Sequence, residues 1–278
     1  MENLFIYLFY FLIFILGASL ASFICASYFR KNNNESKKVK SKKSFCDSCE
    51  KTLSWYQLLP VFSFAAYLGK CKNCKIPIKK EYFICEILLG VFALSLFAFL
   101  QNNLIILINE NLNLFINILI TFTFSFLFGT LTYQDYKEKM VESVYLYLFI
   151  LLTIIFNYFT NFSLYTLLFL VFSFVLAFIF AKKEIYFGFA DLFSIISLFL
   201  FFGLSFGINI FLYSVWIGAI FSIIFMFIKY KKYVKKLEMP FLPFLFFGIL
   251  TFLLLYNIFN FYIIDISYIL ELWQFIMI

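Results

Sequence analysis

The sequence predicts an all-α polytopic membrane protein with about eight transmembrane helices and a small cytoplasmic domain between the first two. Hydrophobic residues make up 64% of its 278 residues, whereas a soluble domain is about half apolar. All 22 Lys and Arg residues fall in four segments that separate apolar runs. The sequence contains no His, which excludes Ser-His-Asp and Cys-His catalysis and any His-ligated metal.

Eight apolar runs are expected to cross the bilayer. The first run follows no basic segment and is too long for the core of a cleavable signal peptide, so we expect it to remain as a spanning helix. The stretch 190–228 must hold two helices, with a break expected at Gly207, because one helix of that length would exceed the bilayer thickness. The expected spans are 4–29, 82–100, 112–133, 143–160, 162–181, 190–206, 208–228 and 241–264.

The distribution of charge predicts the orientation. The basic residues lie in segments 30–80, 137–139, 182–183 and 229–236, which follow alternate spans and therefore share one side of the membrane. The positive-inside rule places these segments in the cytoplasm and both termini outside. Because this rule accounts for the basic residues, nucleic-acid binding is not predicted.

The segment 30–80 contains two CxxC pairs, and its candidate metal ligands are Cys46, Cys49, Cys71 and Cys74. Two such pairs suit tetrahedral Zn²⁺ bound by four thiolates. The alternative is a redox or disulfide role, which a cytoplasmic location disfavours. Residues 53–68 between the pairs are apolar but interrupted by Pro60, so we expect them at the membrane interface, with Trp55 and Tyr56 at headgroup depth.

Two carboxylates adjoin apolar runs at the predicted cytoplasmic face. Asp135 follows one such run, and Asp191 precedes another. A carboxylate in this position is costly and by default indicates a functional site. Two Asp residues that share one proton are the basis of aspartic protease chemistry, and a helix N-terminus favours the ionised form of Asp191. The alternative is that the two pair with Lys137 and Lys183 at the membrane surface.

A third carboxylate, Glu86, lies about one turn inside the second expected span. In one interpretation it reaches towards the membrane surface and pairs with Lys79 or Lys80. In the other it forms a polar wall of an active-site cavity. The sequence supports both interpretations equally.

The order of these motifs resembles the bacterial type IV prepilin peptidases, which are membrane aspartic proteases with a GxGD-type motif. The resemblance is carried by the two CxxC pairs and by Leu53-Ser-Trp-Tyr, Pro60-Val-Phe-Ser, Gly69-Lys-Cys-Lys-Asn-Cys, Glu81-Tyr and Glu86. Asp135 and the stretch Gly188-Phe-Ala-Asp191 stand where the family keeps its two catalytic Asp residues. The resemblance implies that Asp135 and Asp191 are catalytic and that Gly188, Ala190 and Glu86 line the motif or the substrate channel.

The resemblance also implies a reaction. Family members remove the short basic leader from prepilins and pseudopilins just before an apolar helix, and many methylate the new N-terminus with S-adenosylmethionine. Such an enzyme would act in the cytoplasmic (inner) membrane, in type IV pilus assembly or protein secretion. The sequence departs from the family at Ala190, where the motif has Gly, at Val141-Glu142, where an Ile-Pro pair is usual, and at Leu192-Phe193, where Val-Lys often follows.

Three domains are expected: a first transmembrane helix (1–29), a basic linker with the four-cysteine domain (30–80) and a membrane-embedded peptidase domain (81–278). Two other classes of function compete with the peptidase. A zinc-bearing membrane scaffold for pilus or secretion assembly would tolerate loss of both Asp residues. A transporter would place acidic residues near mid-bilayer with Gly or Pro breaks in paired helices, whereas this sequence has its carboxylates at one face.

Overall fold

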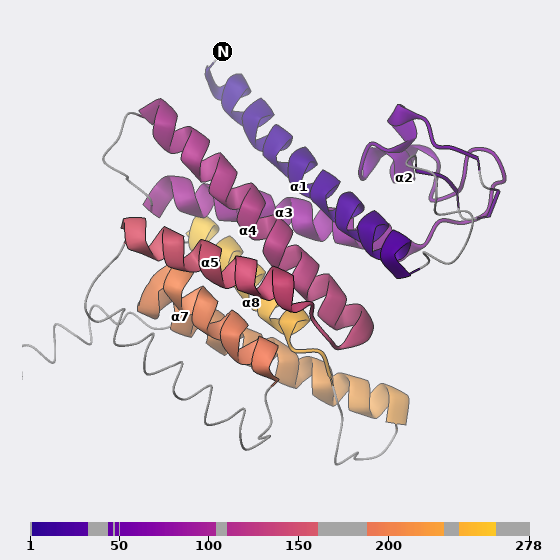
Figure 1. The fold of residues 1–278 in the computed structure, drawn as a ribbon. Helices are drawn as coiled ribbons and strands as arrows, with labels where there is room; N and C mark the ends of the chain where they lie inside the picture. The colour runs from indigo at the N-terminus through magenta and orange to yellow at the C-terminus, as the bar shows by residue number, and fades with distance from the viewer. Residues whose placement is uncertain are drawn as a thin grey trace, which may run out of the picture. The chain divides into compact units, whose positions relative to one another are not determined.

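A computed structural model describes residues 2–32, 44–46, 48–49, 51–103, 110–160, 188–230 and 239–259. These residues are almost entirely helical (Figure 1) and include two isolated β-bridges. Six of the described helices are long and apolar enough to cross a membrane. They are α1 (Glu2–Asn32), α3 (Lys80–Asn103), α4 (Glu110–Glu138), α5 (Ser143–Thr160), α7 (Phe189–Phe225) and α8 (Leu242–Phe259). The short elements are η2 (Trp55–Gln57), α2 (Phe62–Ala66) and the π-helix η3 (Met226–Tyr230).

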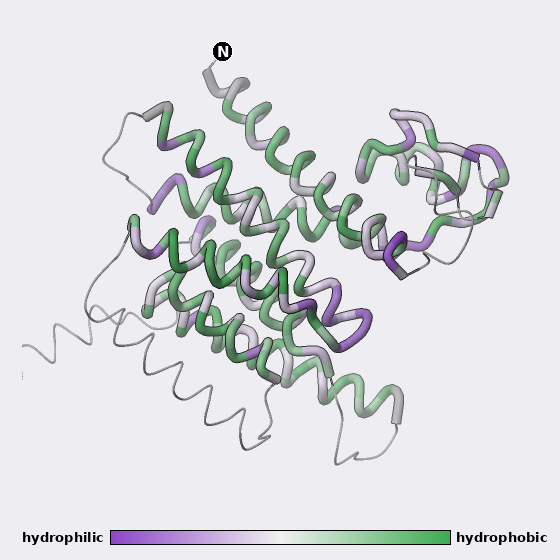
Figure 2. The backbone as a smooth tube through the Cα atoms, in the orientation of Figure 1, coloured by the Kyte–Doolittle hydropathy of each residue, from purple (hydrophilic) through white to green (hydrophobic). Residues whose placement is uncertain are grey.

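The all-α membrane fold is confirmed, but the count of eight spans is not. The expected span 162–181 lies outside the described residues. The expected spans 190–206 and 208–228 form one element, α7. Apolar residues run along the long helices, and hydrophilic residues gather near some of their ends and between α1 and α3 (Figure 2). The hydrophobic pattern therefore located most helices but not the way in which they are joined.

The break expected at Gly207 was placed four residues too late. Gly203 interrupts α7 with φ 79° and ψ 171°, a conformation almost restricted to glycine. Gly207 is helical, and its small size instead serves packing, because a Cβ there would lie 2.6 Å from the ring of Phe199. Sequence alone does not distinguish a glycine that bends a helix from one that allows close contact.

Helix α7 folds back on itself at this break (Figure 1). Asp191, near its start, lies within electrostatic range of Asp135, whose carboxylate binds the N–H of Leu242 at the start of α8. Phe221, near the other end of α7, packs on Phe244 in the first turn of α8 at 5.5 Å. Both ends of α7 therefore lie at the same end of α8, as two spanning segments require.

The break is stabilised from a neighbouring helix. The carbonyl of Leu200, one turn before Gly203, accepts a hydrogen bond of 2.9 Å from the side chain of Asn157 in α5. Phe156 stacks on Phe201 at 4.2 Å beside it. Water is scarce in the bilayer core, so a carbonyl released by a break needs such an internal partner.

The chain forms two compact units. The first comprises residues 1–101 and 110–129, and the second comprises residues 102–109 and 130–278. The four-cysteine segment belongs to the first unit, and both Asp residues belong to the second. The expected division at residues 29 and 80 stays a prediction.

Small residues allow α1 and α3 to approach closely in the first unit. A Cβ at Gly17 would lie 2.6 Å from the Cβ of Ala93, and one at Gly90 would lie 2.7 Å from the ring of Phe14. Helices in lipid gain no hydrophobic energy from association, so close van der Waals contact of this kind stabilises them. The α1–α3 pair holds the two ends of the four-cysteine segment, which connects these helices.

We expect Gly203→Ala to destabilise the protein, because no other residue type tolerates this φ and ψ without a cost of about 1–3 kcal/mol. A Cβ at this position meets no atom within 4 Å, so the effect reports backbone strain alone. Thermal unfolding of the detergent-solubilised protein should show a midpoint lowered by several degrees. Gly218→Ala in the same helix, where a Cβ makes ordinary contacts at 3.4 Å, is the control and should leave it unchanged.

Candidate functional site

The two CxxC pairs adopt the same local structure. In the first, Cys46 N–H donates to the carbonyl of Lys51 at 3.0 Å, and a β-bridge joins Phe45 to Thr52. In the second, Cys71 N–H donates to the carbonyl of Ile76 at 2.9 Å, and a β-bridge joins Lys70 to Pro77. Each pair therefore lies in a short turn closed by a backbone hydrogen bond and a β-bridge at the same spacing as in the other.

The two turns bring four sulfur atoms together. The Sγ atoms of Cys46, Cys49, Cys71 and Cys74 all lie within 4.8 Å of one another. Two of the contacts join different turns, with Cys46 to Cys74 at 3.9 Å and Cys49 to Cys71 at 4.0 Å. A tetrahedral Zn²⁺ with Zn–S bonds of about 2.3 Å requires S···S separations of about 3.8 Å. The four cysteines are free thiols in an arrangement that fits a metal ion.

The surroundings of Cys71 favour the thiolate that a metal requires. Backbone N–H groups of Cys74 and Asn73 donate to its sulfur and lower the pKa of the thiol to about 6. Thiolates, not thiols, are the metal ligands. The backbone of the second turn thus favours the thiolate form of Cys71 over the thiol.

Glu86 has a role that neither interpretation of the sequence included. Its side chain is 9% exposed, and its Oε2 accepts the N–H of Val61 at 2.8 Å. Val61 has φ 65°, which is unusual for a β-branched residue. Ser22 of α1 also hydrogen-bonds to Glu86, whereas Lys79 and Lys80 are not among its described partners. Glu86 therefore holds the turn before α2, as well as lining a cavity.

The segment between the turns packs on the helices beside it. The ring of Phe64 stacks on Phe83 of α3 at 4.5 Å, and Phe62 contacts Phe11 in α1 at 6.1 Å. Helix α2 has only five residues, so it does not cross a membrane, as expected from Pro60. Trp55 remains 76% exposed.

Asp135 is buried, with 6% of its surface exposed, at the C-terminal end of α4. Its Oδ2 accepts the N–H of Leu242 at 2.9 Å, and Phe241 N–H also donates to it. These groups begin α8, whose N-terminus carries partial positive charge. Lys137, one of the two alternative partners, places its Nζ over the rings of Tyr136 and Tyr133 at 5.1 and 5.8 Å.

Asp191 lies in the first turn of α7 and within electrostatic range of Asp135. Its Oδ2 accepts the N–H of Gly188 at 3.3 Å. A Cβ at Gly188 would lie 3.3 Å from that oxygen, so glycine permits the approach. Ala190 is helical and is not among the residues with positive φ, so its methyl group is compatible with the backbone. Lys183, the alternative partner, lies outside the described residues.

The turn after Asp135 is closed by a pair of side-chain hydrogen bonds. Gln134 Nε2 donates to Glu142 Oε1 at 2.7 Å, and Glu142 N–H donates to Gln134 Oε1 at 3.1 Å. A proline has no N–H to make the second bond. Glu142 therefore fixes the start of α5 by a different contact from the proline usual in the resembled family.

Sequence reasoning missed Leu242 and Gln134. Leu242 contributes a backbone N–H, which any residue except proline supplies, so no residue type marks it. Gln134 directly precedes Asp135, but only the fold shows its bond to Glu142. The helix-end argument that favoured an ionised Asp191 is also incomplete, because the start of α8 gives Asp135 the same kind of environment.

Comparison with known proteins identifies the first part of the chain. Residues 15–100 match the family model described as the bacterial peptidase A24 N-terminal domain. The matched segment contains the four cysteines and Glu86, and the resemblance to the prepilin peptidases is confirmed over this segment.

Two curated proteins named prepilin leader peptidase/N-methyltransferase resemble the chain. The one from Myxococcus xanthus is 31% identical over 79 residues, which are 28% of this chain and 23% of the relative. The one from Vibrio cholerae is 32% identical over 59 residues, which are 21% of this chain and 23% of the relative. The matches span about a quarter of each relative, and no solved structure matches the chain. Asp135 and Asp191 lie outside the A24 N-terminal domain.

The four-cysteine cluster should bind about one metal ion per chain, as four thiolates in this geometry do. Elemental analysis of the purified protein should find the metal and show its loss in Cys49→Ser. Cys85→Ser is the matched control, because Cys85 lies in α3 and does not belong to the cluster. Equal metal content in Cys49→Ser and the unsubstituted protein would contradict the assignment.

Proposed function

We propose that the chain is a membrane aspartic endopeptidase that removes the short basic leader from prepilin-like and pseudopilin precursors. The observation that supports it most directly is that Asp135 and Asp191, from α4 and α7, lie within electrostatic range of each other. Two carboxylates that share one proton can activate water and protonate a carbonyl. The A24 N-terminal domain and the names of the two relatives supply the substrate class.

In the proposed mechanism the ionised carboxylate accepts a proton from water as the water oxygen attacks the scissile carbonyl. The protonated carboxylate donates its proton to the carbonyl oxygen. Each Asp accepts a backbone N–H at a helix N-terminus, from Leu242 for Asp135 and from Gly188 for Asp191. These donors orient both carboxylates and stabilise the single negative charge of the pair.

The proposed substrate suits a multi-pass protein with its basic segments in the cytoplasm and both termini outside. A precursor can place its apolar helix in lipid and leave its basic leader in the cytoplasm, beside Asp135 and Asp191. The protein would therefore act in the cytoplasmic (inner) membrane with its active site at the cytoplasmic face, in type IV pilus assembly or protein secretion. Its partners are the precursors and the lipid bilayer.

The metal in the proposed enzyme is Zn²⁺ in a structural role. Cys46, Cys49, Cys71 and Cys74 would hold it with no open ligand position, which is typical of structural sites. Methylation of the new N-terminus with S-adenosylmethionine is a further part of the proposal, and it rests on the names of the relatives.

A zinc-bearing membrane scaffold is the second candidate. The observation that favours it is the extent of the A24 match, which includes the cysteines and stops before both Asp residues. A scaffold and a peptidase differ in one requirement, since only the peptidase needs the two carboxylates.

We expect Asp135→Asn and Asp191→Asn each to abolish cleavage of a co-expressed prepilin-like precursor, because neither Asn accepts a proton from water. Immunoblots of membranes should show full-length precursor with both variants and processed product with the unsubstituted protein. Glu138→Gln is the control, since Glu138 ends the same helix as Asp135 outside the pair. Normal processing by both Asn variants would favour the scaffold.

We also expect Leu242→Pro to lower kcat by about tenfold or more with little change in KM, because it removes a hydrogen bond to a charged group. Proline is well tolerated at the first position of a helix, so α8 should still form. Leu242→Ala is the control for the lost buried side chain and keeps the N–H. Equal kcat for the two variants would show that this N–H does not support catalysis.

A further inference from the structure

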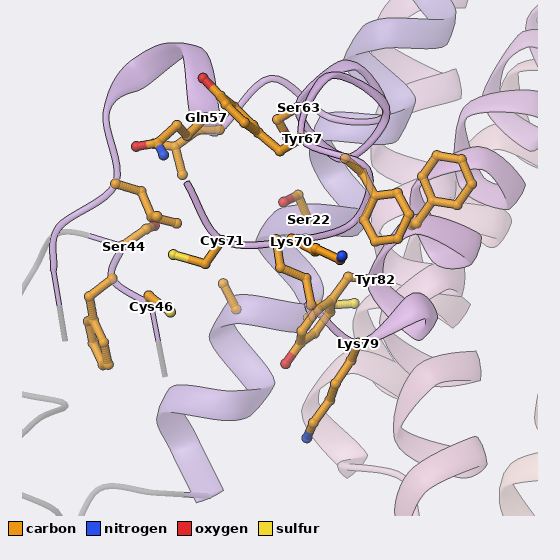
Figure 3. A pocket seen from close by; sticks show the side chains of 18 of the residues that line it. Ser22, Ser44, Cys46, Gln57, Ser63, Tyr67, Lys70, Cys71, Lys79 and Tyr82 are labelled. Carbon is orange, nitrogen blue, oxygen red and sulfur yellow. The ribbon is translucent and has the colours of Figure 1, made fainter. Parts of the chain in front are cut away.

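A cavity of about 360 Å³ lies in the first unit, between the C-terminal end of α1, the four-cysteine segment and the start of α3. Figure 3 shows its labelled polar lining, including Ser22, Lys70, Lys79 and Tyr82. Apolar side chains such as Phe64 and Ile78 form other parts of its wall. This volume and mixed lining are typical of small-molecule sites.

Four cations and one described carboxylate line this cavity. Lys72 is engaged, since its Nζ contacts the hydroxyl of Tyr56 at 3.2 Å. Arg30, Lys70 and Lys79 have no ion-pair partner among the described residues of the chain. The carboxylate, Glu86, is occupied by the N–H of Val61. The cavity therefore offers positive charge that the described part of the chain does not neutralise.

The metal centre does not cancel this charge. Cys46 and Cys71, two of the four metal ligands, also line the cavity. A Zn²⁺ ion with four thiolates would carry a net charge of −2, and together with Glu86 this is less than the charge of the four lining cations. Figure 3 shows the ammonium group of Lys70 pointing away from the sulfur of Cys71. Arg30 belongs to α1 and Lys79 directly precedes α3, outside the two Cys turns.

The cavity also lies where membrane headgroups are expected. Arg30 is in the last turn of α1, and Lys79 stands immediately before α3, both at ends of helices that can cross a membrane. The adjacent segment exposes Trp55 and Leu68, at 76% and 85%. Basic and aromatic residues at the ends of spanning helices mark the interface with lipid.

We propose that this cavity binds a phosphate-bearing anion, either the headgroup of an anionic phospholipid or a soluble phosphate compound. Arg30 and Lys70 hold the phosphate, and the apolar wall accepts the carbon atoms attached to it. A basic leader peptide is excluded as an occupant, because its charge has the same sign as the cavity. The proposal concerns binding in the A24 N-terminal domain and does not depend on cleavage by the carboxylates.

The test is native mass spectrometry of the full-length, delipidated protein with defined ligands. The probes are phosphatidylglycerol, phosphatidylcholine and inorganic phosphate, each titrated separately. The variants are Lys70→Gln, Arg30→Gln and their double substitution. Lys51→Gln is the matched control, because Lys51 is exposed on the first Cys turn and does not line the cavity.

We expect phosphatidylglycerol to bind more tightly than phosphatidylcholine, and each cavity substitution to weaken it about fivefold. The affinity of the double variant for phosphatidylglycerol should fall about 25-fold. Lys51→Gln should bind this lipid with the same affinity as the unsubstituted protein. Tight binding of phosphatidylglycerol with weak binding of phosphate assigns the site to lipid, whereas competition by millimolar phosphate assigns it to a soluble compound. Both results support recognition of phosphate.

Two results would overturn the proposal. One is an equal loss of affinity in Lys51→Gln and in the cavity variants, which would indicate attraction by surface charge in general. The other is binding of phosphatidylcholine and phosphatidylglycerol with the same affinity. Lys70→Arg, which keeps the charge, should retain binding, and metal content should stay constant in all variants. These two measurements separate lost recognition from lost folding, and neither depends on peptidase activity.

Discussion

The structure depends on one constraint, which is that backbone N–H and C=O groups removed from water must find partners inside the protein. Three side chains meet this need where the helices are interrupted. Asn157 binds the carbonyl of Leu200 near the break in α7, Glu86 binds the N–H of Val61, and Asp135 binds the N–H of Leu242. In each case a polar side chain supports backbone that the helix itself cannot satisfy.

This constraint changes how the carboxylates are interpreted. A buried Asp that stabilises a helix N-terminus has a structural reason to exist, and so does a Glu that holds a strained turn. Asp135 differs from Glu86 because a second carboxylate, Asp191, lies within electrostatic range of it. Two like charges held together have no structural benefit. The pairing, rather than the burial of either residue, is therefore the stronger argument for catalysis.

Periodicity and charge predicted most of the helices, and the spacing of the cysteines predicted the metal cluster. Both signals are local in sequence, since apolar runs and CxxC pairs are visible without a fold. The break at Gly203 was missed because Gly207 is an equally plausible position in the sequence. Only the structure distinguishes them: Gly203 has non-helical φ and ψ, whereas Gly207 is helical and packs against Phe199. Leu242 was missed because its contribution is a backbone atom. Features formed between distant segments were therefore the ones that the sequence could not show.

The departures from the resembled family are compatible with the local structure that surrounds them. Ala190 occupies a helical position, so its methyl group does not force the backbone into a conformation that only glycine adopts. Glu142 uses its N–H and its carboxylate to close the turn after Asp135 through Gln134. Phe193 is buried and packs against Phe189 at 4.3 Å. Each substitution leaves Asp135 and Asp191 supported by backbone donors, so the geometry of the pair does not require the residues that the family prefers at these positions.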